Sequence, residues 1–213
     1  MQEVKKKFKI KNIKDFWKWL WNSDSPWSWV VFFVLAFILI RVVFFSLASF
    51  ATGSPLPFVV IESCSMNHPG AFGDFESWWK SYGSWYNEKN ITKEQFEEFK
   101  YNAGMKMGDI IVVSKRSMIN IGDVIIFQTN KDATSIHPII HRAVSLEPLA
   151  TKGDYNSRQL TLANNAYRID ETGISQEQVI GKAVFKIPRL GWVKLIFVKI
   201  YEMLAGVPQS PWC

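Results

Sequence analysis

The chain contains few cysteine and histidine residues, which limits the metal and redox chemistry open to it. Among its 213 residues there are two cysteines, Cys64 and Cys213, and three histidines. Two thiols cannot form the disulfide framework of a small secreted domain, and neither a Cys-x-x-Cys nor a His-Glu-x-x-His spacing occurs. The sequence therefore predicts no metal site and no cofactor. We expect Cys64 to pack as a small apolar side chain, because a bridge to the last residue would need the tail to fold back.

Positive charge is scarce outside one segment. The net charge is +6, and residues 1–19 contain seven lysines against two acidic residues, so the remainder of the chain is close to neutral. Scattered basic residues and the lack of a glycine-rich phosphate-binding loop give little support to nucleic-acid or nucleotide binding. A lysine-rich segment directly before an apolar run is instead typical of a membrane topology signal.

One hydrophobic run is long enough to cross a bilayer. Residues 27–50 are apolar apart from Arg41 and a few serines, and a spanning helix needs about 20 such residues. A cleaved signal peptide has an apolar region of only about 7–15 residues, so we predict a retained transmembrane anchor over residues 27–52, with Arg41 snorkelling toward the headgroups. Pro26 suits the first turn of this helix and Gly53 its end. Tryptophans, which favour the headgroup region, cluster where the run begins: Trp17, Trp19, Trp21, Trp27 and Trp29.

The charge asymmetry around this run predicts an orientation. Lysines are enriched on the cytoplasmic side of membrane proteins. We therefore expect residues 1–26 to form a cytoplasmic basic tail and residues 53–213 to form an extracytoplasmic domain. The predicted localisation is the plasma membrane, which the chain would cross once.

A segment at about 67–104 differs from the rest of this outer domain. It is rich in glycine, tryptophan, tyrosine and charge and has little strand-like alternation. Thr92 and Gln95 form a capping-box pattern that predicts a short helix to about Tyr101. Asn90 begins an Asn-Ile-Thr sequon and is a candidate glycosylation site if the segment lies outside the cell. The tryptophans of the segment could bind a membrane or a partner, or pack against one another.

The remaining pattern predicts a mainly β fold with an antiparallel sheet. Short β-branched runs are separated by glycine, aspartate and proline, which is typical of strands and turns. The last apolar stretch, Trp192–Leu204, is too short to span a bilayer and has helical spacing, so we expect a C-terminal amphipathic helix on the membrane or on the sheet. The predicted strands lie at residues 58–61, 110–113, 124–127, 139–144 and 178–187.

Ser65 and His141 are the best candidates for catalysis. A serine hydroxyl is a weak nucleophile until a base removes its proton, and a histidine held by a carboxylate can act as that base. By itself such a pair is not specific. His68 is a rival base because of its closeness to Ser65 in sequence, but a base on the same turn as its nucleophile would rarely point correctly. His137, beside a proline, is expected to be a loop residue.

An ordered set of short motifs makes the pair more specific. Together these motifs resemble type I signal peptidases, specifically the archaeal and endoplasmic-reticulum branch, and the resemblance covers most of residues 30–195. It implies a signal-peptidase-like antiparallel β catalytic domain with one N-terminal transmembrane helix. The motifs are Ser63-Cys64-Ser65-Met66, Gly122-Asp123-Val124-Ile125, His141-Arg142, Lys152-Gly153-Asp154, Gln178-Val179-Ile180-Gly181-Lys182 and Ile187-Pro188-Arg189-Leu190-Gly191-Trp192.

The resemblance also implies roles for individual residues. Ser65 maps to the nucleophile, and the Ser63 hydroxyl, by analogy with bacterial relatives, would help the Ser65 backbone N–H to form the oxyanion hole. His141 stands where the bacterial branch has a lysine base. Asp154 and Asp170 match the functional aspartates of the family, and the choice between them as the partner of His141 stays open.

Three departures from the family pattern stand out. Cys64 replaces the usual glycine between the two serines, one extra residue follows Met66, and about 35 residues are inserted before Met107. A side chain at position 64 could narrow the cleft. The insertion has no counterpart among the motifs.

The function implied by the resemblance is that of a membrane-bound serine endopeptidase that removes signal peptides from exported preproteins. Its partners would be secretory preproteins with small residues near the cleavage site, the lipid bilayer and, as a further candidate, the translocation channel. The substrate would add an extended strand to residues 58–62. Two alternatives remain: a non-catalytic membrane-tethered peptide-binding module of the same fold, and a processing peptidase dedicated to one substrate.

Overall fold

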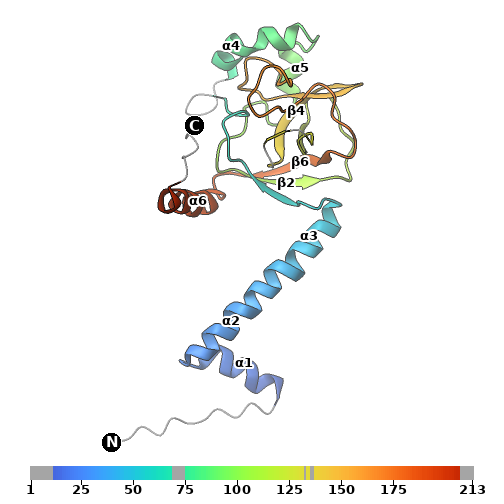
Figure 1. Ribbon diagram of the computed structural model, residues 1–213. Coiled ribbons are helices and arrows are strands. Elements are labelled where there is room, and N and C mark those ends of the chain that lie inside the picture. Colours follow the sequence, from blue (N-terminus) through green and yellow to red (C-terminus); the bar gives the residue numbers. More distant parts are fainter. Residues whose placement is uncertain (1–11, 69–74, 132, 135–136, 207–213) are drawn as a thin grey trace, which may run out of the picture. The chain divides into compact units, whose positions relative to one another are not determined.

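A computed structural model describes residues 12–68, 75–131, 133–134 and 137–206 of the chain (Figure 1). It divides after Ala51 into two compact units. The division falls close to the boundary that the sequence predicts between the anchor and the outer domain. Each unit is described by itself below.

The first unit consists of a short helix followed by a long one. Helix α1 (Ile13–Asn22) leads into α2 (Pro26–Ile38), which continues through a π-helical segment η1 (Leu39–Phe44) into α3 (Phe45–Thr52). Together α2, η1 and α3 form one helix of 27 residues, and its most apolar 18-residue window has a mean hydropathy of 2.9. Its length and composition are sufficient to cross a membrane, and it is the only such helix among the described residues.

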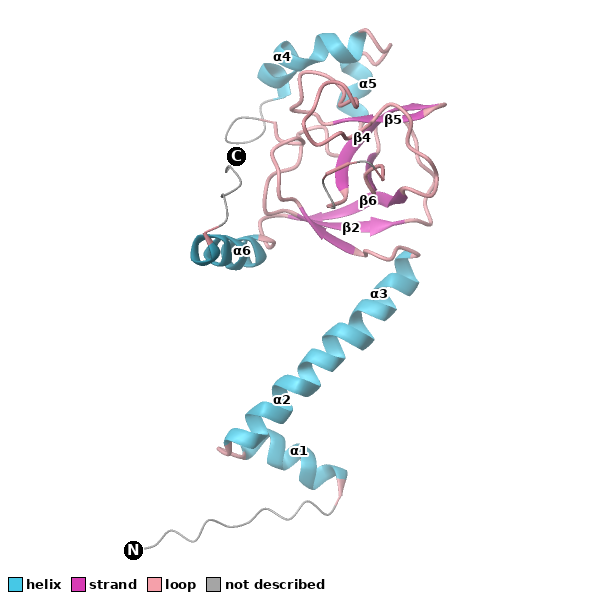
Figure 2. Cartoon of the chain, in the orientation of Figure 1, coloured by secondary structure: helices cyan, strands magenta, loops and turns pink. Residues whose placement is uncertain are grey.

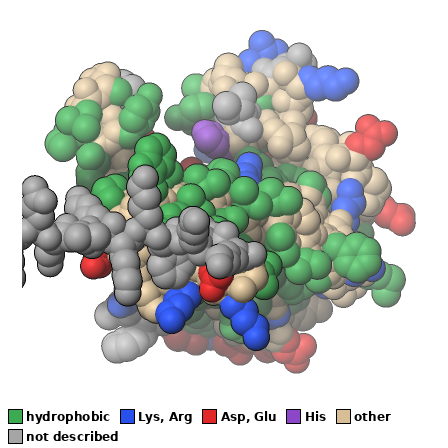
Figure 3. Space-filling model, turned by 90° about the horizontal axis from the view of Figure 1, so that it is seen from below, with side chains coloured by type: hydrophobic (Ala, Val, Ile, Leu, Met, Phe, Trp, Pro, Cys, Tyr) green, Lys and Arg blue, Asp and Glu red, His purple; other side chains and the backbone are tan. Residues whose placement is uncertain are grey.

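The sequence explains both ends of the long helix and its exposed surface. Pro26 stands in the first turn, where its missing N–H costs nothing, and Gly53 follows the last turn with a φ of +66°, which glycine adopts readily. The most apolar window of the helix has no buried share within the structure. Arg41 lies within the π-helical segment and is exposed. Hydrophobic side chains also occupy much of the molecular face drawn in Figure 3.

The second unit is built on a six-stranded sheet in which neighbouring strands are antiparallel (Figure 2). The strand order is β1-β2-β6-β3-β4-β5, so β1 and β5 lie at the edges. The strand with no counterpart among the predicted runs is β5. The bounds are β1 (Phe58–Val60), β2 (Ile110–Ser114), β3 (Val124–Phe127), β4 (Ile139–Leu146), β5 (Leu149–Lys152) and β6 (Val179–Ile187).

Burial along the strands follows their place in the sheet. In β2 the side chains of Ile111 and Val113 are fully buried while their neighbours are half-buried, which is the alternation of a strand with one covered face. All four residues of the more central β3 are buried. The core against β2 also contains Met66, which is 1% exposed. The turn that carries Ser65 is therefore fixed by its next side chain.

Helices make up more of the protein than the sequence indicates. Of the described residues 38% are helical and 18% lie in strands, so the antiparallel sheet is confirmed but the fold is not clearly mainly β. The helices that the sequence did not predict are α1 and one helix in the inserted segment. The helix predicted near the C-terminus is confirmed as α6 (Trp192–Ala205). The capping box at Thr92 is also confirmed and begins α5 (Lys93–Glu98).

The inserted segment forms two helices that pack against β4 and β5. Helix α4 (Phe75–Asn87) was not predicted and lies next to α5 in Figure 1. Its aromatic side chains meet those of α5 near these two strands. The tryptophans of the segment therefore take part in internal packing. The buried members of this cluster are Trp78, Tyr86, Ile91, Phe96, Val144 and Ala150.

Candidate active site

Ser65 lies in a turn that follows strand β1. Its backbone carbonyl accepts a hydrogen bond from the N–H of Tyr155 at 2.8 Å, and the buried Met66 holds the other side of the turn. The Ser65 hydroxyl lies 3.2 Å from the Ser63 hydroxyl, within hydrogen-bond distance. The two serines that the sequence places at the nucleophile and the oxyanion hole are therefore in direct contact.

His141 lies on β4 and is almost fully buried. Its register partner on β3 is Ile125, and its side chain is 3% exposed. Its Nδ1 atom is hydrogen-bonded to the carboxylate of Glu171. An ionised carboxylate can only accept hydrogen bonds, so Nδ1 carries the proton and the Nε2 lone pair is left as an acceptor. This is the arrangement that a histidine general base requires.

Glu171 is fixed in place by several groups and has no exposed side-chain surface. The hydroxyl of Thr151 donates to Oε1 at 3.0 Å. The backbone N–H of Leu160 donates to Oε2 at 2.8 Å. Since a buried carboxylate must have its lone pairs satisfied, these donors allow it to remain charged beside His141.

The structure corrects the prediction that Asp170 is a partner of His141. The Oδ1 atom of Asp170 accepts instead from the backbone N–H of Thr172 at 3.0 Å and from its hydroxyl at 2.7 Å. Neighbouring side chains in an extended segment point to opposite sides. Ile169 and Glu171 are buried, whereas Asp170 between them is only partly buried. The apolar Ile169 two residues earlier was the sequence signal that marked position 171 as facing inward.

Ser65 and His141 come close to each other at Gly153. A Cβ atom placed on Gly153 would stand 2.7 Å from Nε2 of His141 and 2.9 Å from the carbonyl oxygen of Ser65. Both groups are therefore close neighbours of the same point, and any side chain there would collide with them. In the described part of the chain the Ser65 hydroxyl bonds to Ser63 rather than to His141. Catalytic hydrogen bonds commonly tighten only when substrate is bound.

Asp154 does not orient His141 either, which corrects the second predicted partner. It forms a bidentate ion pair with Arg142, with Nε–Oδ1 at 2.9 Å and Nη2–Oδ2 at 2.6 Å. The hydroxyl of Tyr86 donates to the same carboxylate at 2.9 Å. Arg142 and Asp154 have no exposed side-chain surface. Because neighbouring side chains of a β-strand face opposite sides, the side chain of Arg142 lies on the other face of β4 from His141. Asp154, its ion-pair partner, lies on that face as well.

The charge state of Asp154 follows from these partners. Burial alone would raise the pKa of Asp154, but the charge of Arg142 and hydrogen bonds from His68 and Arg142 outweigh it and hold the pKa well below its usual range. Asp154 is therefore a permanently charged counter-ion of Arg142. It ties the inserted helix α4, through Tyr86, to strand β4.

His68 belongs to the same buried network. Its Nε2 lies 3.1 Å from Asp154 Oδ2, and its ring stacks on Trp78 with a centroid distance of 3.9 Å. Burial lowers the pKa of His68 despite the nearby carboxylate, so the ring is neutral near pH 7. Because the Nε2–H group of His68 donates a hydrogen bond to Asp154 and its ring is covered, His68 is not available as the base. The preference for His141 over His68 is in accord with this geometry.

Lys152 is a buried lysine that sequence reasoning did not single out. Its ammonium donates to the carbonyl of Gly153 at 3.0 Å and lies 4.7 Å from the ring centre of Tyr86 and 5.2 Å from that of Trp85. Burial lowers the pKa of Lys152 to about 8. Helix α4 therefore holds, through its aromatic rings, the lysine that fixes the backbone next to the base.

Cys64 corrects another expectation. It is disulfide-bonded and is not a free apolar side chain. The second cysteine of the sequence, Cys213, lies outside the described residues.

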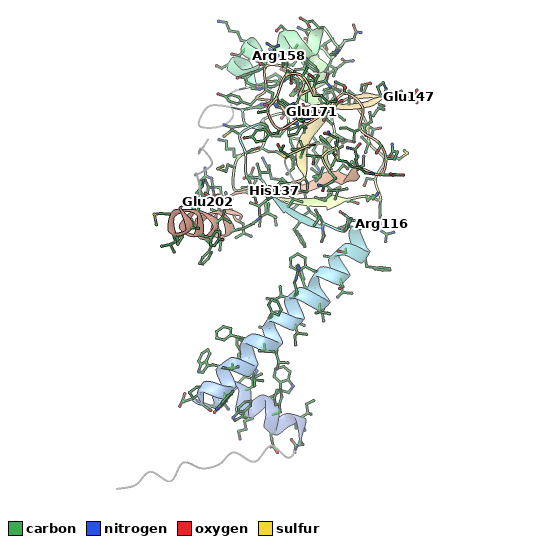
Figure 4. All side chains as sticks on the ribbon, viewed as in Figure 1. Arg116, His137, Glu147, Arg158, Glu171 and Glu202 are labelled. Atoms are coloured by element: carbon green, nitrogen blue, oxygen red, sulfur yellow. The ribbon has the colours of Figure 1, made fainter. Side chains whose placement is uncertain are left out.

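The remaining residues singled out in the sequence lie away from this cluster. Asn90 is exposed, with a φ of 60°, in the turn between α4 and α5. His137 is exposed and stands apart from Glu171 in Figure 4. Among the described residues no group of three or more histidine, cysteine, aspartate and glutamate side chains has the geometry to hold a metal ion.

A comparison with models of known protein families finds no match, and a comparison with curated proteins finds none either. A functional assignment of this chain therefore depends on its residues and their geometry.

Proposed function

We propose that this protein is a membrane-anchored serine endopeptidase that removes signal peptides from exported preproteins. The observation that carries the proposal is the cluster at Gly153. Here the Nε2 of His141, on the side away from Glu171, and the backbone of Ser65 approach the same point. A buried histidine oriented by a carboxylate next to a serine in a turn is the constellation of a serine hydrolase. The ordered signal-peptidase motifs supply the substrate class.

The proposed reaction uses groups already in place. The Ser65 oxygen attacks the scissile carbonyl carbon while its proton passes to Nε2 of His141. The Ser63 hydroxyl and the Ser65 backbone N–H donate hydrogen bonds to the tetrahedral oxyanion. When the carbon–nitrogen bond breaks, His141 gives the proton to the leaving amine, and an acyl group remains on Ser65. Water, deprotonated by His141, then hydrolyses this ester.

Glu171 has a defined part in both steps. When His141 becomes an imidazolium it is a cation in an almost waterless environment, and the carboxylate hydrogen-bonded to Nδ1 compensates that charge. The bonds from Thr151 and Leu160 leave this carboxylate no freedom to turn away. For the attack, the Ser65 hydroxyl must leave Ser63 and face Nε2 of His141.

The edge of the sheet offers a place for the substrate backbone. Strand β1 lies at one edge and leads into the Ser65 turn after five residues. An extended peptide can add to such an edge through main-chain hydrogen bonds, which are independent of sequence. Small side chains near the cleavage site, as in signal peptides, would then lie beside Ser65.

The anchor accounts for where the substrate meets the site. The proposed span, Pro26–Thr52, ends six residues before β1 begins, and the Thr52 carbonyl accepts hydrogen bonds from Lys115 N–H at 3.0 Å and from Ser114 Oγ at 3.2 Å. The linker is therefore short and attached to β2. With the lysine-rich N-terminus in the cytoplasm, the peptidase unit would stand outside, close to where an exported chain emerges.

One observation favours a narrower version of this function, a peptidase dedicated to few substrates. The ring of Tyr82 on the inserted helix α4 lies 5.3 Å from the ring of Tyr155, whose backbone holds Ser65. Tyr155 is 40% exposed. An aromatic pair beside the nucleophile restricts which side chains fit there.

The test is cleavage of preproteins by the full chain in detergent micelles or proteoliposomes. Ser65→Ala and His141→Ala should abolish cleavage, and Asp170→Asn, next to the site but outside the triad, should leave it within about twofold of wild type. If both alanine variants cleave like wild type, the mechanism is wrong. If wild type binds signal peptides without cutting any of them, the non-catalytic binding module is the correct function. Cleavage of one preprotein in a mixed set identifies the dedicated peptidase.

A further inference from the structure

Helix α1 has an exposed apolar ridge bordered by lysines. Ile13, Trp17 and Trp21 are spaced four residues apart and so lie along one line of the helix. Their exposed fractions are 73%, 49% and 68%. Lys14 and Lys18 form the adjacent line and are also exposed.

Helix α1 packs against α2 at its C-terminal end. Leu20 is 7% exposed, and the ring of Trp21, at one end of the ridge, meets that of Phe32 on α2 edge-on, with a centroid distance of 5.6 Å. Despite this contact Trp21 stays 68% exposed, so most of the surface of Ile13, Trp17 and Trp21 is uncovered by the described part of the chain. Exposing a row of apolar side chains that includes two tryptophans to water is unfavourable in free energy.

The connection between the two helices is rigid. The Ser28 hydroxyl donates to the carbonyls of Ser23 at 2.8 Å and Ser25 at 2.7 Å, and the Ser25 N–H donates to the Ser23 hydroxyl at 3.2 Å. Figure 1 shows α1 turned across the start of α2 instead of continuing it. When the long helix crosses a bilayer, this bend between α1 and α2 directs α1 along the membrane surface.

We propose that α1 is an interfacial helix that binds the anionic lipid headgroups of the leaflet in which the long helix begins. Tryptophan rings favour the headgroup level, and lysines beside an apolar ridge attract anionic lipids. The surface is continuous with Trp27 and Trp29, which are 72% and 59% exposed where the long helix begins. Five more lysines precede α1 in the sequence. This inference rests on the membrane anchoring proposed above, but not on the peptidase chemistry.

Amide hydrogen exchange of the full chain in lipid nanodiscs tests the proposal. The nanodiscs contain phosphatidylcholine alone, or phosphatidylcholine with about one quarter phosphatidylglycerol. Each lysine at an anionic surface favours the bound state by about fivefold, so amides of residues 13–22 should exchange at least tenfold more slowly with phosphatidylglycerol. High salt should remove most of this difference.

Charge reversal supplies the control. The double variant Lys14→Glu/Lys18→Glu should lose the dependence on phosphatidylglycerol, whereas Lys80→Glu/Lys131→Glu, at two exposed positions of the second unit, should keep it. Equal exchange of residues 13–22 in the two lipids, or an unchanged lipid dependence in the first variant, would overturn the proposal. Exchange across Pro26–Thr52 is read in the same experiment, so a failure of the anchor itself is seen separately.

Discussion

Replacing Glu171 by glutamine removes the charge that faces His141 and changes almost nothing in shape. In the native protein one carboxylate oxygen of Glu171 accepts from His141 Nδ1–H and from the Thr151 hydroxyl, and the other accepts from the Leu160 N–H. A glutamine side chain has one oxygen and one NH₂ group. It can therefore accept hydrogen bonds either from His141 and Thr151 or from the Leu160 N–H, but not from both sides.

The two orientations of the new amide have different consequences for His141. If its oxygen faces the Leu160 N–H, its NH₂ group faces His141, which must then accept at Nδ1 and carry its proton on Nε2. If its oxygen faces His141, its NH₂ group opposes the Leu160 N–H in a buried site, at a cost of about 1–3 kcal/mol. The first orientation blocks proton transfer from Ser65. A base held in the wrong tautomer lowers kcat by about 10⁴-fold in a serine protease triad, which corresponds to roughly 5 kcal/mol of transition-state stabilisation.

The assay is single-turnover cleavage of a preprotein, with circular dichroism and thermal unfolding to show that the variants fold. We expect Glu171→Gln to lose about 10³–10⁴-fold in the cleavage rate, Glu171→Asp to lose less, and Asp170→Asn to lose at most about twofold. A folded Glu171→Gln protein that keeps more than a tenth of the wild-type rate would refute the assignment of Glu171 as the residue that orients His141. An equal loss in Asp170→Asn would refute it as well.

Three further changes test the surroundings of this pair. Gly153→Ala, at a position without left-handed backbone, puts a methyl group 2.7 Å from His141 Nε2. It should reduce cleavage at least about 100-fold and cost about 1–3 kcal/mol of stability by overpacking, as measured by cleavage rate beside urea unfolding. Asp154→Asn leaves Arg142 buried without its counter-ion and should cost about 3–5 kcal/mol in the free energy of unfolding. Since the pKa of Asp154 is lowered in the folded state, wild type should lose this stability as the pH falls below about 4, and the variant should not. Burial lowers the pKa of Lys152 from its usual 10.5 to about 8 in the folded state. The folded state therefore binds fewer protons between these limits, and wild type should gain about 3 kcal/mol of stability as the pH rises through them. Lys152→Met should lack this gain in denaturant unfolding. A flat wild-type profile over that interval would contradict the burial of a titrating ammonium.

Local patterns in the sequence determined the elements of this protein. The long apolar helix, the capping box at Thr92, the C-terminal helix and five of the six strands could be predicted, because each depends on neighbours within one or two turns or one strand. The motifs around Ser65 and His141 likewise identified the two residues whose chemistry is most distinctive. The inserted helix α4 escaped prediction because Gly83 interrupts it and its aromatic residues have only modest helix propensity.

Which side chains meet was decided only by the tertiary structure. Asp154, Asp170 and Glu171 are all carboxylates near the motif, and their chemical type does not distinguish them. Strand pleating turns Arg142 away from His141 and takes Asp154 with it, while the same alternation points Glu171 inward and Asp170 outward. The sequence by itself identified Ser65 and His141 as the candidate pair, within an ordered set of motifs. The orienting carboxylate was chosen by contacts between segments 30 residues apart, which no local pattern records.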